Sequence, residues 1–317
     1  MKQLRLIKSI ILLVLIGIIT AGCTDDTLEP TETTDDSILT IYSTVYPIQF
    51  AIEKIGGDTV NAKTVYPPGV DAHSYEPTSK EMTTIAKADA FIYLGAGMEA
   101  FAETAADALE NQELALIEIG EHKELFHMEE DDEHEEDHHE HNHGDNDPHI
   151  WIDPERMLKM SEIIKDELVS LNPESEALYN ENFTSLKEEL IALDNKFTEI
   201  LKTKSKKEIL VAHAAYGYWE ERYGIQQIAI SGLSSSSEPS QKELTEIIDQ
   251  AKNHNLTYII FEQNSSNRVS EIIQSEIGAE ALTIHNLAVL TDKDISNDED
   301  YFSLMEENMT VLDQATE

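Results

Sequence analysis

The chain has 317 residues, of which 40% are hydrophobic and 27% charged. This is the composition of a globular protein, and the length allows two lobes of roughly 130 residues each. Its 63 acidic and 22 basic residues give a formal net charge of −41. Such a charge repels nucleic acid and anionic lipid headgroups, so we expect cations as small ligands and no nucleic-acid partner.

The N-terminus has the pattern of an export signal. Three basic residues precede an apolar run at residues 10–19, and Thr20-Ala21-Gly22-Cys23 follows. The apolar run is too short to span a membrane, so residues 1–22 are predicted to be a signal peptide. Residues 23–36 are rich in Thr, Asp and Pro and predict a disordered tether.

Cys23 is the only cysteine, so no intramolecular disulfide can form. Its surroundings resemble the lipobox of bacterial lipoproteins, although Thr20 stands where an aliphatic residue is usual. The resemblance implies that Cys23 carries lipid and becomes the mature N-terminus. The protein would then be anchored on the extracytoplasmic face of the cell membrane, as on a Gram-positive surface.

Strand and helix patterns alternate from residue 37 onward. Strands are predicted at residues 38–44, 59–65, 89–94 and 115–119, with helices near 47–56, 78–87 and 98–110. A second series has strands at residues 208–212, 225–230, 257–262 and 280–284, with helices near 215–223, 240–253 and 267–276. This βα alternation predicts an α/β protein of two similar lobes, residues 37–173 and 204–317, each with a mainly parallel sheet.

Residues 174–203 contain no Gly or Pro and place apolar residues at helical spacing. One helix of this length would be roughly 45 Å long, and we expect it to join the two lobes as a rigid rod. The alternative is a long helix packed wholly on one lobe.

Residues 121–147 form an acidic, histidine-rich stretch that cannot contribute a core and is predicted to be a mobile insertion. Closely spaced imidazoles and carboxylates provide many weak metal sites, which supports a metal-gathering role close to a tight site. The alternative is a solvated acidic loop. The histidines assigned to this loop are His134, His138, His139, His141 and His143.

Four other histidines follow predicted strands. His73, His149, His213 and His285 lie two in each lobe, near the carboxyl ends of strands, where ligands bind in open parallel sheets. Imidazole is a good ligand for zinc and other first-row divalent ions, whereas Mg²⁺ and Ca²⁺ prefer oxygen shells. Spacing alone does not show that the four histidines meet.

Several segments resemble those of the metal-binding lipoproteins of bacterial zinc ABC importers, the cluster A-I (cluster 9) solute-binding proteins. The segments are "PPGVDAHSYEPT", "DPHIWIDP", "VAHAAYGYW" and "ISGLSSSSEPSQKEL". The resemblance implies two Rossmann-like lobes bridged by a long rigid helix, with one zinc ion in the cleft between them. It implies a monomer that delivers zinc to an ABC permease.

By the same resemblance, His73, His149 and His213 match the family's histidine ligands, and a histidine in the third position is typical of zinc members. At the fourth position many zinc members have a glutamate, where this chain has Ala288. Manganese members place an aspartate slightly earlier, at a position that corresponds best to His285. We therefore expect His285 as the fourth ligand, with Glu262 or a water molecule as alternatives.

Three competing interpretations remain. "LGAGMEA", residues 94–100, fits a dinucleotide-binding pattern with Glu118 as the ribose-binding acid, although tight-turn glycines explain the motif better. A zinc hydrolase would need an open metal position and a general base, for which Glu76 is the candidate, but we expect no enzymatic activity. A manganese or other divalent-metal binder, or a surface adhesin, is the alternative within the family.

Overall fold

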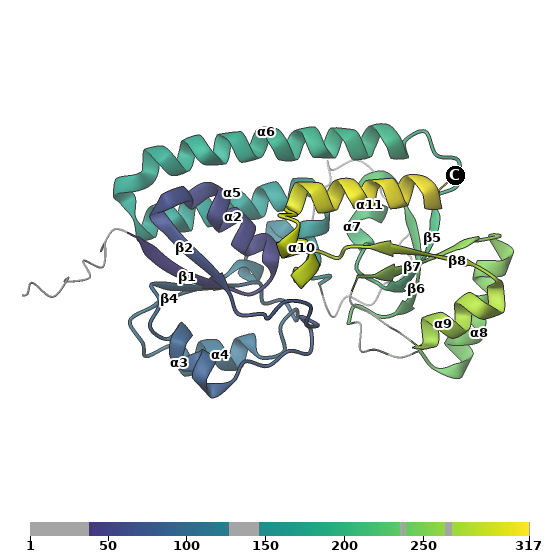
Figure 1. The fold of residues 1–317 in the computed structure, drawn as a ribbon, viewed down its shortest axis with the longest axis horizontal. Helices are drawn as coiled ribbons and strands as arrows, with labels where there is room; N and C mark the ends of the chain where they lie inside the picture. The colour runs from purple at the N-terminus through teal and green to yellow at the C-terminus, as the bar shows by residue number, and fades with distance from the viewer. Residues whose placement is uncertain (1–37, 127–145, 235–236, 238, 264–267, 317) are drawn as a thin grey trace, which may run out of the picture. The chain divides into compact units, whose positions relative to one another are not determined.

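Two four-stranded parallel sheets form the framework of this α/β protein (Figure 1). The computed structural model describes residues 38–126, 146–234, 237, 239–263 and 268–316. The predicted signal peptide, Cys23 and the tether lie outside the described residues. The same is true of the five loop histidines, His134, His138, His139, His141 and His143.

The first sheet has the strand order β2-β1-β3-β4. Its strands are β1 (Leu39–Ser43), β2 (Val60–Thr64), β3 (Ala90–Tyr93) and β4 (Ala115–Glu118), and its helices are α2 (Tyr46–Gly56), α3 (Ser79–Ile85) and α4 (Ala102–Leu109). All four residues of β3 are buried, because helices cover both faces of a parallel sheet.

The second sheet repeats this arrangement with the order β6-β5-β7-β8. Its strands are β5 (Glu208–His213), β6 (Gln226–Ser231), β7 (Tyr258–Glu262) and β8 (Glu280–Ile284), and its helices are α7 (Gly217–Tyr223), α8 (Gln241–Asn253) and α9 (Arg268–Ile277). The two parallel sheets confirm the predicted α/β class. In each sheet the order reverses beside the central strand, and the loops at the carboxyl ends of such strands form the usual ligand crevice.

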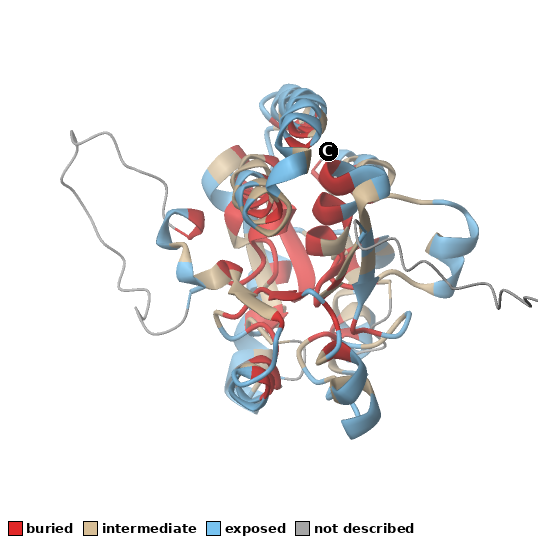
Figure 2. Ribbon diagram, turned by 90° about the vertical axis from the view of Figure 1, so that its left-hand side faces the viewer, coloured by how far each residue is buried: buried red, intermediate tan, exposed pale blue. Residues whose placement is uncertain are grey.

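Helix α6 (Glu176–Leu201) runs along both sheets at the top of Figure 1. Its buried residues recur every three or four positions, so one stripe faces the protein: Tyr179, Phe183, Leu186, Leu190, Leu193, Phe197 and Leu201. The stripe packs on α2 and on α5 (Pro154–Leu171), and α6 also contacts α11 (Tyr301–Ala315). The opposite face of α6 is exposed (Figure 2).

Helices α5 and α11 lie outside the elements predicted from the sequence. Asp153 caps α5 by accepting a hydrogen bond from the Glu155 N–H, and Pro154 occupies the first helical position, where proline is favoured. Asp300 caps α11, which follows the short α10 (Asp292–Ser296). Both helices pack against α6.

Buried apolar residues from both sheets share one continuous core, while Leu210, Ile230 and Ile259 of the second sheet belong to a smaller cluster with α8 and α9. Buried positions therefore run through the middle of the protein between the helices (Figure 2). Separating the sheets would expose apolar surface at a cost of about 25 cal/mol per Å², so the shared core opposes a wide hinge motion. Within the described part of the chain, no helix is both long and apolar enough to cross a membrane.

Candidate metal centre

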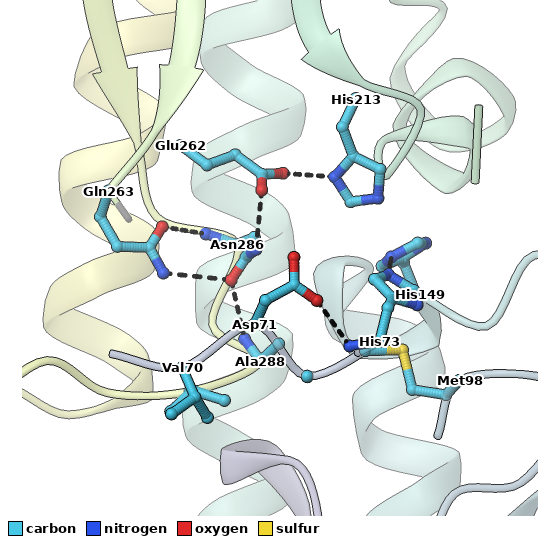
Figure 3. Close-up of a pocket in the computed structure, with 12 residues that line it drawn as sticks. Val70, Asp71, His73, Met98, His149, His213, Glu262, Gln263, Asn286 and Ala288 are labelled. Atoms are coloured by element: carbon cyan, nitrogen blue, oxygen red, sulfur yellow. Dashed lines mark hydrogen bonds and ion pairs between the residues drawn. The ribbon is translucent and has the colours of Figure 1, made fainter. Parts of the chain in front are cut away.

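Three histidines from distant parts of the chain meet in one pocket (Figure 3). Their donor atoms all lie within 4.8 Å of one another, and the Nε2 atoms of His73 and His149 are 3.3 Å apart. The ring centroid of His213 lies 4.8 Å from that of His149 and 5.6 Å from that of His73. Two nitrogens bound to one tetrahedral zinc ion lie about 3.3 Å apart, so the spacing fits a shared ion.

Local turns fix the first two histidines. The Asp71 carboxylate accepts hydrogen bonds from the backbone N–H groups of His73 (2.9 Å) and Ser74 (3.1 Å) in the loop after β2. The Asp147 carboxylate accepts from the backbone N–H of His149 (3.0 Å) and pairs with its Nδ1 at 2.7 Å. Because Asp147 engages Nδ1, the Nε2 atom of His149 is left for a metal.

The segment that carries His149 is held by side chains from later elements. Its backbone carbonyls accept hydrogen bonds from three aromatic residues: Tyr218 donates to Asp147 (2.6 Å), Trp219 to Ile152 (2.8 Å) and Tyr301 to Trp151 (2.8 Å). Trp151 in turn donates from its indole nitrogen to the Asn286 carbonyl at 2.8 Å. His149 precedes α5 in the chain, but these contacts attach it to α7, α11 and the loop after β8.

His213 ends β5 and is almost completely buried. Its Nδ1 lies 2.6 Å from the Glu262 carboxylate, and its Nε2 lies 3.0 Å from the Leu233 carbonyl. Burial lowers the pKa of His213, but the contacts with Glu262 and Leu233 outweigh it, so the pKa is raised. The metal-free ring therefore favours a proton on each nitrogen, and a metal at Nε2 would displace one of them.

The pKa of His73, in the segment after β2, is shifted in the opposite direction. Burial and the neighbouring rings of His149 and His213 lower its pKa to about 4. Its imidazole is therefore neutral at physiological pH, with a lone pair available for a metal ion. The pKa of Glu262 is lowered, because hydrogen bonding to His213 outweighs the effect of burial, so this carboxylate is ionised.

His285, which the sequence predicts as the fourth ligand, lies outside the group of three histidines. Its Nε2 lies 3.0 Å from the Asp294 carboxylate, and its Nδ1 accepts the Leu287 backbone N–H at 2.9 Å. Both ring nitrogens are therefore engaged away from the pocket. The sequence contained a signal for this contact, because Asp294 belongs to the capping box of α10, nine residues after His285.

The pocket beside the three histidines has a volume of about 60 Å³. Glu262, Gln263, Asn286 and Ala288 complete much of its lining (Figure 3). This volume holds a metal ion with a water molecule. Ala288 occupies the position expected to carry glutamate in many zinc members, and its methyl group offers no ligand atom. Sequence reasoning missed the contributions of Asp147 and Asn286, although Asp147 stands only two residues before His149.

The "LGAGMEA" motif has no room for a dinucleotide. The buried Glu99 carboxylate accepts hydrogen bonds from the backbone N–H groups of Leu94 (3.0 Å) and Gly95 (2.9 Å). A Cβ atom at Gly95 would lie 2.1 Å from the Glu118 carboxylate, and Glu118 accepts a hydrogen bond from Tyr93 (3.0 Å). Carboxylates thus occupy the place that the motif offers to phosphate, and the glycines serve a tight turn.

Residues 41–315 match the family described as zinc-uptake complex component A periplasmic, ZnuA. The chain belongs to this family. Among curated ZnuA relatives it is 30% identical to the high-affinity zinc uptake system protein ZnuA of Bacillus subtilis strain 168, over 93% of both chains. It is 32% identical to the zinc-binding lipoprotein AdcA of Streptococcus pneumoniae serotype 4, over 89% of this chain and 56% of AdcA. The chain thus spans about half the length of the AdcA relatives that it matches.

Solved structures show the same fold. The Zn(II)-bound ZnuA-like domain of S. pneumoniae AdcA superposes with a TM-score of 0.72 at 31% identity, covering 88% of this chain and 99% of that domain. The laminin-binding protein Lmb of Streptococcus agalactiae, described as a bifunctional protein with adhesin and metal transporting activity, gives 0.74 at 25% identity, covering 88% of this chain and 100% of Lmb. The ZnuA family is one of solute-binding proteins, and its fold is the two-lobe architecture seen here.

Proposed function

We propose that this ZnuA-family chain captures Zn²⁺ in the pocket between its two sheets and delivers it to an ABC permease for import. The convergence of three buried or half-buried imidazoles on one point carries this proposal. Imidazole ligands favour zinc over the harder ions Mg²⁺, Ca²⁺ and Mn²⁺, which prefer oxygen. The names of the curated relatives, which describe zinc binding and zinc uptake, support the same cargo.

In this proposal His73, His149 and His213 bind zinc through their Nε2 atoms. The contact between His149 and Asp147 favours this choice of nitrogen, as does the contact between His213 and Glu262. Zinc in protein sites is usually four-coordinate, so one position remains. A water molecule in the 60 Å³ pocket beside Ala288 completes the site.

The remaining assignments follow from the sequence and the family. We propose that residues 1–22 direct export, lipid on Cys23 anchors the monomer at the cell surface, and residues 23–36 form the tether. Residues 37–173 and 204–317 are the two lobes, with the linking helix between them, and the histidine-rich loop gathers zinc near the pocket. Because the family binds and delivers its solute, we expect no catalytic turnover.

The other candidate functions have less support. Manganese members are expected to have glutamate where this chain has His213, and three imidazoles are a poor match for manganese. An adhesin role rests on the likeness to laminin-binding proteins such as Lmb. Zinc delivery therefore remains the function that the pocket supports best.

Metal analysis of the purified mature protein tests the proposal. We expect one tightly bound zinc ion per chain after exposure to equimolar Zn²⁺ and Mn²⁺ and removal of loosely bound metal. The His73→Ala and His213→Ala variants should lose this ion. Retention of tight stoichiometric zinc by both variants, or a preference for manganese in the unaltered protein, would refute the pocket as a zinc site.

A further inference from the structure

Glu262 is a buried carboxylate at the pocket whose role differs from that of a metal ligand. It ends β7 and is 7% exposed. One of its oxygens, Oε1, lies 2.6 Å from the His213 Nδ1 and accepts from the Tyr216 hydroxyl (3.2 Å), and Oε2 accepts from the Asn286 side-chain amide (2.9 Å). Three donors, from the end of β5, the N-cap of α7 and the loop after β8, therefore surround this single carboxylate.

The position of Glu262 separates it from the metal-binding group. Within the described residues, the mutually close donor atoms belong to His73, His149 and His213, and no Glu262 oxygen is among them. To bind the ion directly, Glu262 would have to leave donors that already satisfy both of its oxygens.

A dication among neutral ligands needs negative charge nearby. Three imidazoles and a water molecule bring no charge to zinc, and burying an uncompensated ion in a small pocket is costly. Glu262 behind His213 and Asp147 behind His149 place two carboxylates next to the ligands, each in contact with a ligand's Nδ1. Their charge equals that of Zn²⁺ in magnitude.

We propose that Glu262 is a positioning residue for zinc: it holds the Nδ1 proton of His213 so that Nε2 faces the ion, and with Asp147 it balances the charge of the ion from behind the ligands. The fourth coordination position can therefore remain with a neutral water beside Ala288. This inference rests on the proposed zinc function and specifies how the same pocket works.

Asn286 links Glu262 to the other side of the pocket. Its side chain donates to Glu262, and its carbonyl oxygen Oδ1 accepts from the Gln263 amide (3.1 Å). Its backbone N–H donates to the Gln263 side chain (3.0 Å), and its backbone carbonyl accepts the Trp151 indole N–H (2.8 Å). One residue thus connects the support of His213 with the segment that carries His149.

The test compares zinc dissociation constants, measured by competition with a chelator, for the full mature chain and its Glu262→Gln variant. Glutamine keeps the size of the side chain but removes the charge, and loss of such a supporting group typically weakens metal binding about 10- to 100-fold. We expect a weakening in this range with one zinc still bound per chain. An unchanged dissociation constant would overturn the proposal.

Cobalt substitution distinguishes a positioning residue from a ligand. If Glu262 supports His213 from behind, the visible bands of the Co²⁺ complex should keep their wavelengths and intensities in Glu262→Gln, because the ligand set is unchanged. A clear change in these bands, as expected when a carboxylate ligand is lost, would overturn the proposal while leaving zinc binding by the pocket intact. Failure of the unaltered chain to bind zinc or cobalt would instead refute the proposed function.

Two further variants separate the effect of charge from a general loss of structure. Glu99→Gln alters a similarly buried carboxylate, 4% exposed, that contacts no histidine, and it should leave the zinc dissociation constant within about twofold. Glu262→Asp keeps a negative charge behind His213, and we expect it to weaken zinc binding less than Glu262→Gln does. Equal weakening by Glu262→Asp and Glu262→Gln, or by Glu99→Gln, would contradict a charge-balancing role.

Discussion

The Nε2 atoms of His73 and His149 lie 3.3 Å apart, although 76 residues separate them in the chain. Two buried or half-buried imidazoles held nitrogen to nitrogen need either a shared proton or a shared cation between them. The pKa of His73 is lowered to about 4, which disfavours the added proton that would charge its ring, so without a metal ion a single N–H proton lies between the two nitrogens. A divalent metal ion is the partner that this arrangement fits, and His213 supplies the third nitrogen.

The His149→Ala and His285→Ala variants should behave differently. His149→Ala removes a donor from the three-histidine group, so we expect loss of stoichiometric zinc by elemental analysis. His285 contacts Asp294 and the Leu287 N–H instead, so His285→Ala should keep one tight zinc ion and lower the free energy of unfolding by roughly 1–3 kcal/mol. Loss of tight zinc from His285→Ala would restore it as a candidate ligand.

Deleting residues 127–145 should leave the tight site in place. The three histidines of the pocket lie outside this range, so the deletion variant should bind one zinc ion with an unchanged dissociation constant. The number of additional, weakly bound zinc ions in a titration should fall. A matched control replaces only the six histidines of this range, His127 and the five loop histidines, with Gln and should reproduce this loss. Disappearance of the tight ion would assign it to the loop.

Zinc affinity should fall as the pH decreases. Because its pKa is raised, the His213 ring becomes protonated at a higher pH than a free imidazole does as the pH falls. Zinc must displace this proton in order to bind. Below that pKa each unit of pH should weaken binding about tenfold, and the slope should steepen near the pKa of His73, about 4. Calorimetric titrations in buffers of different ionisation enthalpy count the released protons, and constant affinity between about pH 5 and about pH 7.5 would contradict this prediction.

Arg156 should contribute more to stability than a surface lysine. Its guanidinium is 1% exposed, pairs with Asp153 at 2.7 Å and with Glu221 at 2.6 Å, and donates to the Leu125 carbonyl. Arg156→Ala would take one of two cationic partners from the fully buried Asp153 carboxylate, which would keep only Arg222 at 3.4 Å. We therefore expect a loss of about 3 kcal/mol in urea unfolding of the metal-free protein.

The exposed pair of Lys196 and Glu306 provides the comparison. Both side chains are about half exposed, at 54% and 49%, so solvent screens their 2.5 Å contact. Lys196→Ala should therefore cost no more than about 1 kcal/mol. Equal losses for Arg156→Ala and Lys196→Ala would show that burial of the first pair contributes nothing to stability.

Periodicity predicted most elements well but did not reveal all of them. The helix expected at residues 174–203 occurs as Glu176–Leu201, because its long apolar stripe is unbroken by Gly or Pro. Helices α5 and α11 were missed, although an Asp caps each of them. The Asp153-Pro154 cap of α5 belongs to "DPHIWIDP", whose interpretation as a ligand segment obscured the start of a helix.

The sequence by itself determined the parallel α/β fold and placed four histidines near strand ends, because alternating apolar patterns specify strands and helices and parallel strands end at a common edge. Only the tertiary structure decided which imidazoles face one another. Some of the contacts that orient the rings are local, since Leu287 and Asp147 each stand two residues from the histidine that they contact, His285 and His149. The contact that orients His213 is not local, since Glu262 lies 49 residues further along the chain. Contacts between distant residues form only when the whole chain packs, so no local pattern specifies where the three imidazoles meet.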